Sequence, residues 1–151
     1  SISAKLDDLH KNNIKVIHLG NKLELSKKLQ RAISRAEKIT SKNTELTLSI
    51  AFNYGGRDEL IKAIKMIVSE NIPQDNITEQ TISERLYSKN IPDPDLIIRT
   101  AGEMRISNFL IWQSAYAEYY FTQVLWPDFN KTHVSEALEE YSKRHRKYGS
   151  F

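Results

Sequence analysis

A chain of 151 residues that is 40% hydrophobic and 27% charged has the balance of a globular domain rather than that of a disordered segment. It has no cysteine, which excludes disulfides, thiolate metal sites and a cysteine nucleophile, and no apolar run approaches the roughly 20 residues of a membrane span. The net charge of +3 suits an anionic small molecule but is too small to indicate nucleic acid as a partner, and we expect a cytoplasmic protein.

The first half of the chain alternates helices and strands. Ile2, Leu6 and Leu9 recur at helical spacing from the very start, where no methionine stands. We therefore expect a piece of a longer protein whose N-terminal part is missing. Further patterns predict strands at residues 14–19 and 46–52 and amphipathic helices at residues 25–39 and 60–68.

The second half continues this alternation. Residues 96–98 are wholly apolar, as a strand buried on both faces of a parallel sheet would be. The other patterns predict helices at residues 78–87, 108–116 and 134–146 and a strand at residues 119–124. The order of elements predicts one α/β domain over residues 1–151, a largely parallel β-sheet flanked by helices, with the N-terminal part of the domain missing.

Three glycine-containing segments each follow a predicted strand. They are Gly20, the pair Gly55 and Gly56, and the loop at residues 99–107. Ligands of parallel sheets bind beyond the carboxyl ends of the strands, so we expect these segments to face a ligand. A Gly-Gly pair by itself, however, favours a role in the turn alone.

The loop after the third predicted strand contains two arginines and a glycine. Gly102 tolerates the positive φ of a sharp turn, which would let Arg105 swing back towards Arg99. Two converging guanidinium groups suit a diphosphate, because each makes paired, charge-assisted hydrogen bonds.

Ser107 is the third candidate of this loop. It precedes an apolar run that predicts a helix, so it is an N-cap candidate, and the N–H groups of a helix start also favour an anion. The composition supports an alternative equally well. In that alternative Arg99 pairs with Glu103 or Asp95, and Ser107 only caps its helix.

Glu118 stands in a tyrosine-rich stretch, between Ala117 and Tyr119. A carboxylate in apolar surroundings needs a partner, because burying it unpaired costs several kcal/mol. As a hard oxygen ligand it would suit magnesium. A salt bridge to a neighbouring arginine or lysine is the simpler alternative, and the residue alone favours it.

Three blocks of the sequence resemble the cis-prenyltransferase family of the undecaprenyl-diphosphate-synthase kind. They are residues 95–112 (DLIIRTAGEMRISNFLIW), residues 116–128, which begin YAEYYFT and end WPD, and residues 46–58 (LTLSIAFNYGGRD). The blocks occur in the family's order, and the likeness covers nearly the whole chain. The first block is long and specific.

The resemblance implies roles for the matching residues. Arg99, Arg105 and Ser107 match the residues that hold the diphosphate of isopentenyl diphosphate, and the backbone of Ile106 between them is expected to join this contact. Glu118 matches the carboxylate that helps hold Mg²⁺. The strand at residues 46–52 would line an apolar tunnel for the growing chain, since each buried CH₂ contributes ~0.8 kcal/mol.

The resemblance also implies the reaction and the partners. An allylic diphosphate, farnesyl diphosphate in the first instance, loses pyrophosphate as the olefin of isopentenyl diphosphate attacks, a proton leaves, and a cis double bond forms. The product would be a long-chain cis-polyprenyl diphosphate such as undecaprenyl diphosphate, a lipid carrier of the cell wall. We expect a homodimer formed through the last strand and helix, and peripheral membrane contact at product release.

Two departures from the family pattern limit these expectations. The family's Met-Asp-Gly-Asn-Gly-Arg-Trp loop, which supplies the essential Asp and grips the allylic substrate, is not in these 151 residues. We therefore expect no catalytic Asp here, and a piece that is inactive alone. The family's Arg-x-Gly ending reads Lys147-Tyr148-Gly149 with Arg146 beside it, so a phosphate contact of the tail is doubtful. A non-catalytic partner subunit of the same fold is the alternative.

Overall fold

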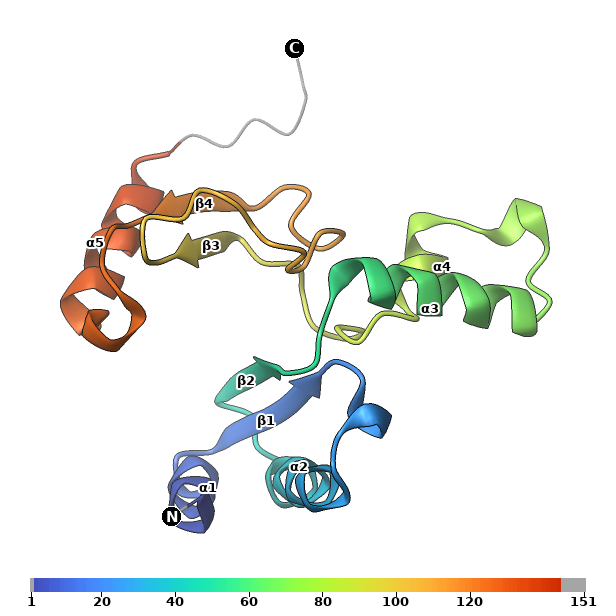
Figure 1. Ribbon diagram of the computed structural model, residues 1–151, viewed down its shortest axis with the longest axis horizontal. Coiled ribbons are helices and arrows are strands. Elements are labelled where there is room, and N and C mark those ends of the chain that lie inside the picture. The colour runs from blue at the N-terminus through green and yellow to red at the C-terminus, as the bar shows by residue number, and fades with distance from the viewer. Residues whose placement is uncertain (1, 145–151) are drawn as a thin grey trace. The chain divides into compact units, whose positions relative to one another are not determined.

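The computed structural model describes residues 2–144. The chain divides into two compact units, residues 1–90 and residues 91–151, whose elements are labelled in Figure 1. The first unit contains α1 (Ile2–Lys11), β1 (Ile14–Leu19), α2 (Lys27–Thr40), β2 (Leu46–Ala51), α3 (Gly56–Ser69) and α4 (Glu79–Ser83). The second contains β3 (Leu96–Arg99), β4 (Glu118–Phe121) and α5 (Lys131–Ser142). The single domain expected from the sequence stays a prediction.

The strands pair in parallel in both units. β1 pairs with β2, with Ile14 opposite Leu46, and β3 pairs with β4, with Leu96 opposite Glu118. Hydrogen bonds thus join the described strands into two two-stranded sheets, one in each unit. The α/β class with parallel strands and flanking helices is confirmed.

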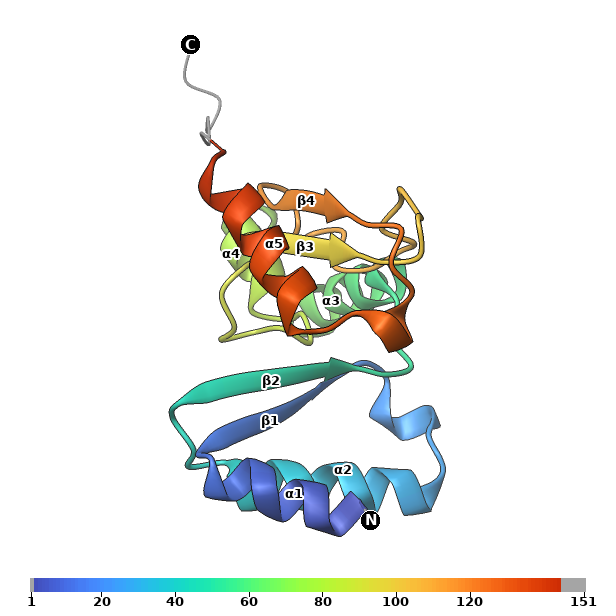
Figure 2. The ribbon, with the colours of Figure 1, turned by 90° about the vertical axis from the view of Figure 1, so that its left-hand side faces the viewer.

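In the first unit α1 and α2 lie along the same side of the β1–β2 pair, as Figure 2 shows. The fully buried hydroxyl of Thr40 ties the end of α2 to this pair, because it accepts a hydrogen bond from the N–H of Val16 at 2.9 Å. Val16 and Leu19 of β1 and Leu6 of α1 are buried apolar side chains of this unit. The predicted helices and strands of this half are therefore confirmed, with ends shifted by a few residues.

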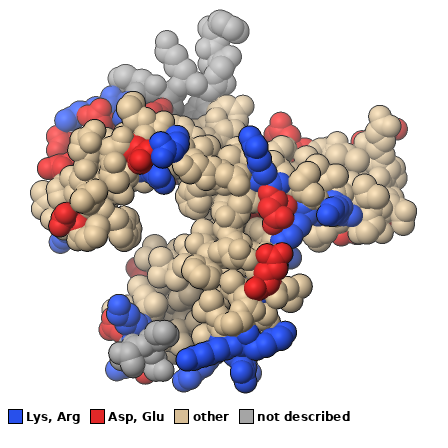
Figure 3. Space-filling view, viewed as in Figure 1, with Lys and Arg blue, Asp and Glu red and all other residues tan. Residues whose placement is uncertain are grey.

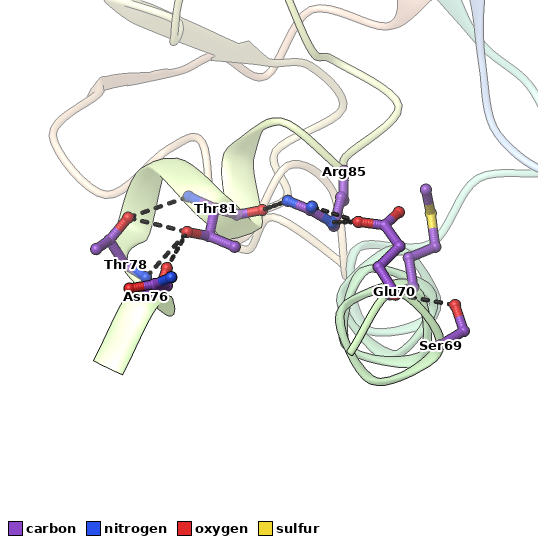
Figure 4. Close-up of polar contacts among 7 residues, drawn as sticks. Ser69, Glu70, Asn76, Thr78, Thr81 and Arg85 are labelled. Atoms are coloured by element: carbon purple, nitrogen blue, oxygen red, sulfur yellow. Dashed lines mark hydrogen bonds and ion pairs between the residues drawn. The ribbon is translucent and has the colours of Figure 1, made fainter. Parts of the chain in front are cut away.

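An ion pair joins the end of α3 to the residues that follow α4. Arg85 donates to Glu70 through Nε and Nη2 and to the carbonyl oxygen of Thr81 at 2.6 Å, and Figure 4 shows this chain of contacts. Thr78 caps α4 by accepting from the N–H of Thr81. The helix predicted at residues 78–87 exists, but it ends at Ser83 because the chain then turns.

The helix predicted at residues 108–116 is wrong. The chain there forms successive turns, with left-handed φ angles of 46° at Ser107, 64° at Asn108 and 46° at Leu110. A right-handed helix cannot begin through residues in that conformation. The expectation that Ser107 caps a helix is wrong for the same reason.

The last predicted helix corresponds to α5. It begins at Lys131 after the N-cap Asn130 and packs against β4. The basic residues Arg146 and Lys147, whose phosphate contact was doubtful from the sequence, lie outside the described residues. Within residues 2–144, the structure contains no helix long and apolar enough to cross a bilayer.

Candidate functional site

Arg99 ends β3 at the carboxyl edge of the strand pair. Its carbonyl oxygen accepts from the N–H of Thr122 at 2.9 Å, which holds the backbone beside the extension of β4. Its side chain is half-buried, and its Nε is buried without a hydrogen-bond partner among the described residues. A buried donor without an acceptor costs about 1–3 kcal/mol, so this guanidinium lacks an acceptor that a ligand could supply.

A tight turn follows Arg99 directly. Ala101 and Gly102 both adopt left-handed conformations, with φ angles of 64° and 68°. Their N–H groups donate to the carbonyl oxygens of Val124 and Thr122, at 2.8 and 2.9 Å. The positive φ expected at Gly102 is confirmed, and the turn is fixed to the residues that follow β4, the strand that begins at Glu118.

Arg105 does not lie free beyond this turn. Its Nη1 forms an ion pair with a carboxylate oxygen of Glu103, and its side chain is mostly exposed. The alternative considered from the sequence gave Glu103 to Arg99, whereas the structure gives it to Arg105. Glu103 therefore occupies, as an internal anion, part of the donor set that a diphosphate would use.

The rest of the loop stays open to solvent. Ser107 is exposed and Ile106 is half-buried. The carbonyl oxygen of Ile106 accepts from the N–H of Phe109 at 2.9 Å, which closes the turn that replaces the expected helix. Arg99, Arg105 and Ser107 thus share one loop, and the loop offers two guanidinium groups and a hydroxyl to an anion.

Glu118 has a salt-bridge partner from the end of the described chain. Nη1 of Arg144 donates to its Oε2 at 2.8 Å and to the carbonyl oxygen of Tyr119 at 2.8 Å. Both charged side chains are about 30% exposed. The salt bridge considered from the sequence as the simpler alternative therefore exists. It does not exclude a metal, because Oε1 has no hydrogen bond from the described residues.

The strand register keeps Glu118 apart from Arg99. Glu118 is opposite Leu96 at the start of the pair, and Arg99 is opposite Phe121 at its end. Three residues of strand separate their positions by ~10 Å, and the pleat sends side chains three apart to opposite faces. Arg99, Arg105 and Ser107 share one segment of the chain, whereas the strand register does not bring Glu118 to Arg99.

The described residues fit magnesium only in part. A magnesium site takes one or two carboxylates together with water and substrate phosphate, and Glu118 can supply one. Residues 2–144 contain no cluster of three or more acidic, histidine or cysteine side chains that could hold an ion by themselves. Any metal at Glu118 would need further oxygen ligands, and Arg144 would compete for the carboxylate.

Glu59 is a buried carboxylate that the sequence pattern does not reveal. It is 1% exposed and accepts from the hydroxyl of Tyr54 at 2.5 Å and from the N–H of Tyr87 at 2.8 Å. Glu59 lies in the first turns of α3, where the helix dipole favours a negative charge. The one available signal is a pair of acidic residues, Asp58 and Glu59, in the first turn of the helix after Gly55 and Gly56, and it does not indicate burial.

An apolar groove lies between α2 and the strands of the first unit. It has a volume of about 290 Å³, and its lining includes Ile17, Ile33, Ile50 and Phe52. Ile50 and Phe52 belong to the 46–52 segment expected to line a tunnel, and both are about half exposed. The groove suits a hydrocarbon, and the tunnel itself stays a prediction.

Comparison with known proteins places this geometry in a family. The family model described as undecaprenyl diphosphate synthase matches residues 1–149. The chain is 47% identical over 148 residues to an isoprenyl transferase of Fusobacterium nucleatum, covering 98% of this chain and 63% of that protein. It is 46% identical to a ditrans,polycis-undecaprenyl-diphosphate synthase of Pasteurella multocida, named as (2E,6E)-farnesyl-diphosphate specific, covering 99% of this chain and 64% of that protein.

A solved structure agrees with these relatives. The crystal structure of lavandulyl diphosphate synthase from Lavandula x intermedia, in complex with dimethylallyl diphosphate, matches with a TM-score of 0.91 and 36% identity. The match covers 99% of this chain and 66% of that one. The chain thus spans somewhat less than two thirds of the two curated relatives. It belongs to the undecaprenyl diphosphate synthase family of prenyltransferases.

Proposed function

We propose that this chain holds isopentenyl diphosphate within a cis-prenyltransferase that condenses it with an allylic diphosphate. Farnesyl diphosphate is the proposed starter, because the Pasteurella relative is named as specific for it. A long-chain cis-polyprenyl diphosphate such as undecaprenyl diphosphate is the proposed product. The observation that carries this proposal is the unpartnered Nε of Arg99, at the start of a loop with the family's motif.

In this proposal the loop binds and orients the acceptor substrate. Arg99 meets the diphosphate from a fixed strand end, and Arg105 leaves Glu103 to meet it from the other side. The hydroxyl of Ser107 and the N–H of Ile106 add neutral donors. Holding the diphosphate at these points fixes the olefin of isopentenyl diphosphate for attack on the allylic carbon, whose bond to pyrophosphate breaks as the new C–C bond forms. A proton then leaves the condensed intermediate as the cis double bond forms.

Glu118 is the proposed magnesium ligand of this chain. A magnesium ion would neutralise charge on the diphosphates. Arg144 orients the carboxylate at the start of β4, because its Nη1 donates to Oε2 of Glu118 and to the carbonyl oxygen of Tyr119. We further propose a homodimer, a cytoplasmic location, and peripheral contact with a membrane when the polyprenyl product leaves.

A binding measurement tests the part of the site that this chain contains. We expect isopentenyl diphosphate to bind the 151-residue chain in a calorimetric titration. Binding should weaken by at least about 10-fold in Arg99→Ala, as expected for a lost charge-assisted contact. The matched control is Arg35→Ala, at an exposed position of α2, and it should leave the binding of isopentenyl diphosphate unchanged. Equal binding by Arg99→Ala and wild type would overturn the assignment.

A second assay tests the reaction. The full-length protein that carries this sequence should incorporate radiolabelled isopentenyl diphosphate with farnesyl diphosphate and Mg²⁺, and the 151-residue chain should not. A folded full-length protein that binds isopentenyl diphosphate without incorporating it would instead support the non-catalytic partner subunit.

A further inference from the structure

The outward face of α2 carries a band of cations without a carboxylate. At 3.6 residues per turn, five basic positions fall within an arc of about 100° on the helix. They are Lys27, Lys28, Arg31, Arg35 and Lys38, and all are exposed. The one acidic residue of the helix, Glu37, lies outside this arc and is occupied by the N–H of His18 and the Nζ of Lys22. We call these five cations the α2 basic band.

This band concentrates the positive charge of the chain. The helix has five basic residues against one acidic residue, whereas the whole sequence has 22 against 19. Among the residues that the structure describes, no ion pair involves any of the five. The neighbouring α1 is balanced in charge, with Lys5 and Lys11 against Asp7 and Asp8. In Figure 3 blue side chains gather along the lower edge, where Figure 1 places α2.

A groove and an exposed leucine border the band. The groove has a volume of about 590 Å³, and its lining includes Lys27, Arg31, Gln30 and Leu23. Leu23 lies in the short turn Lys22–Glu24 before α2 and is 84% exposed. A large apolar side chain beside cations is the arrangement with which interfacial segments meet a bilayer, the cations at the phosphates and the apolar group at the acyl boundary.

We propose that the α2 basic band, together with Leu23, docks the protein on the anionic phosphate headgroups of a membrane. Each lysine or arginine near such a surface adds to the attraction, so five cations without an ion pair among the described residues favour reversible binding at low salt. A membrane fits better than a nucleic acid, because no aromatic side chain stands among the cations to stack on bases. A role of this surface in the release of a polyprenyl product rests on the proposed function. Binding of the surface to a membrane is measured without substrate.

Vesicle co-sedimentation of the full chain tests the proposal. We expect binding to phosphatidylcholine vesicles that contain phosphatidylglycerol, little binding to pure phosphatidylcholine, and loss of binding as salt rises. The double variant Arg31→Glu/Arg35→Glu should bind at least about 10-fold more weakly. Lys65→Glu/Lys89→Glu makes the same charge change at exposed positions of the first unit outside α2, and it should bind as wild type does. Leu23→Ser should weaken binding but keep the dependence on salt.

Three outcomes would overturn the docking surface. The first is a folded chain that does not bind anionic vesicles. The second is an equal loss of vesicle binding in the two double variants. The third is preferential binding of an oligonucleotide over the vesicles. Circular dichroism of each variant shows that it is folded. A full-length protein that binds vesicles but performs no condensation would contradict the proposed function and support the docking surface. Condensation without vesicle binding would do the reverse.

Discussion

Arg144, two residues after the end of α5, forms a salt bridge with Glu118, the first residue of β4. One nitrogen, Nη1, donates to Oε2 of Glu118 and to the carbonyl oxygen of Tyr119, each at 2.8 Å. The bond to the backbone fixes the position of the guanidinium group, so the carboxylate meets a cation that is already oriented. The pair therefore compensates the charge of Glu118 without the help of a metal.

Removing Arg144 and Glu118 singly and together should reveal a coupling of about 1 kcal/mol in the free energy of unfolding. Charge-assisted hydrogen bonds would by themselves give a larger coupling energy. Both side chains are about 30% exposed, however, so solvent screens the interaction between them. Urea unfolding of the wild type, Arg144→Ala, Glu118→Ala and the double variant measures this coupling energy. The exposed pair of Lys143 and Glu139 on α5 is the matched control and should show no measurable coupling. Additive single effects at Arg144 and Glu118 would contradict the pairing.

Glu103→Gln should tighten the binding of isopentenyl diphosphate. In the free chain Glu103 holds Arg105 in an ion pair, which a diphosphate must displace. An exposed pair of this kind is worth up to about 1 kcal/mol, so the dissociation constant should fall by up to about 5-fold. Titration calorimetry measures it, and Glu136→Gln, which removes the same charge from an exposed site on α5, controls for net charge. Weaker binding in Glu103→Gln would instead show that Glu103 orients Arg105 for the ligand.

Local chemistry explains the part of the fold that the sequence predicts. The 14–19 strand matches β1 residue for residue, because its β-branched residues end at Gly20. Gly20 has a φ of 133°, and an added Cβ would lie 2.4 Å from the carbonyl oxygen of Phe52. The positive φ at Gly102 was likewise predictable from the residue type.

The missed features are one local turn and two relationships between residues far apart in the sequence. The apolar spacing of residues 108–116 fits a helix, but left-handed residues at 107, 108 and 110 turn the chain instead. Glu118 and Arg144 are 26 residues apart, and no local pattern indicates their pairing. The separation of Arg99 and Glu118 follows from the register between β3 and β4. The sequence of either strand does not reveal this register.

Ala101→Gly should stabilise the chain by about 1 kcal/mol. Ala101 has a φ of 64°, a conformation that costs a residue with a Cβ roughly 1–2 kcal/mol. Glycine avoids this cost, but its greater conformational entropy in the unfolded chain offsets part of the gain. Thermal unfolding should show a higher midpoint. The same exchange in a right-handed helix, Ala32→Gly in α2, should lower stability by about 1 kcal/mol. A loss of stability at both positions would show that the side chain of Ala101 makes contacts that outweigh its backbone conformation.

Glu59→Ala should be the most destabilising of these substitutions, by about 2–4 kcal/mol in the free energy of unfolding. Glu59 is 1% exposed, and its two carboxylate oxygens accept from the hydroxyl of Tyr54 and from the N–H of Tyr87. Alanine removes both acceptors and leaves space where the carboxylate stood. Tyr87 is itself held through its hydroxyl, which accepts from Nζ of Lys62 at 2.6 Å, so the loss should loosen the segment that follows α4.

Hydrogen exchange separates this local loosening from general instability. Amides of residues 84–90 should lose protection in Glu59→Ala before those of β1 and β2, because the Tyr87 N–H depends directly on Glu59. Glu59→Gln keeps one carbonyl acceptor and should cost less than alanine. Glu136→Ala, an exposed glutamate of α5, should change stability by under about 0.5 kcal/mol. If Glu59→Ala were no more destabilising than Glu136→Ala, the buried carboxylate would not be what joins the start of α3 to Tyr87.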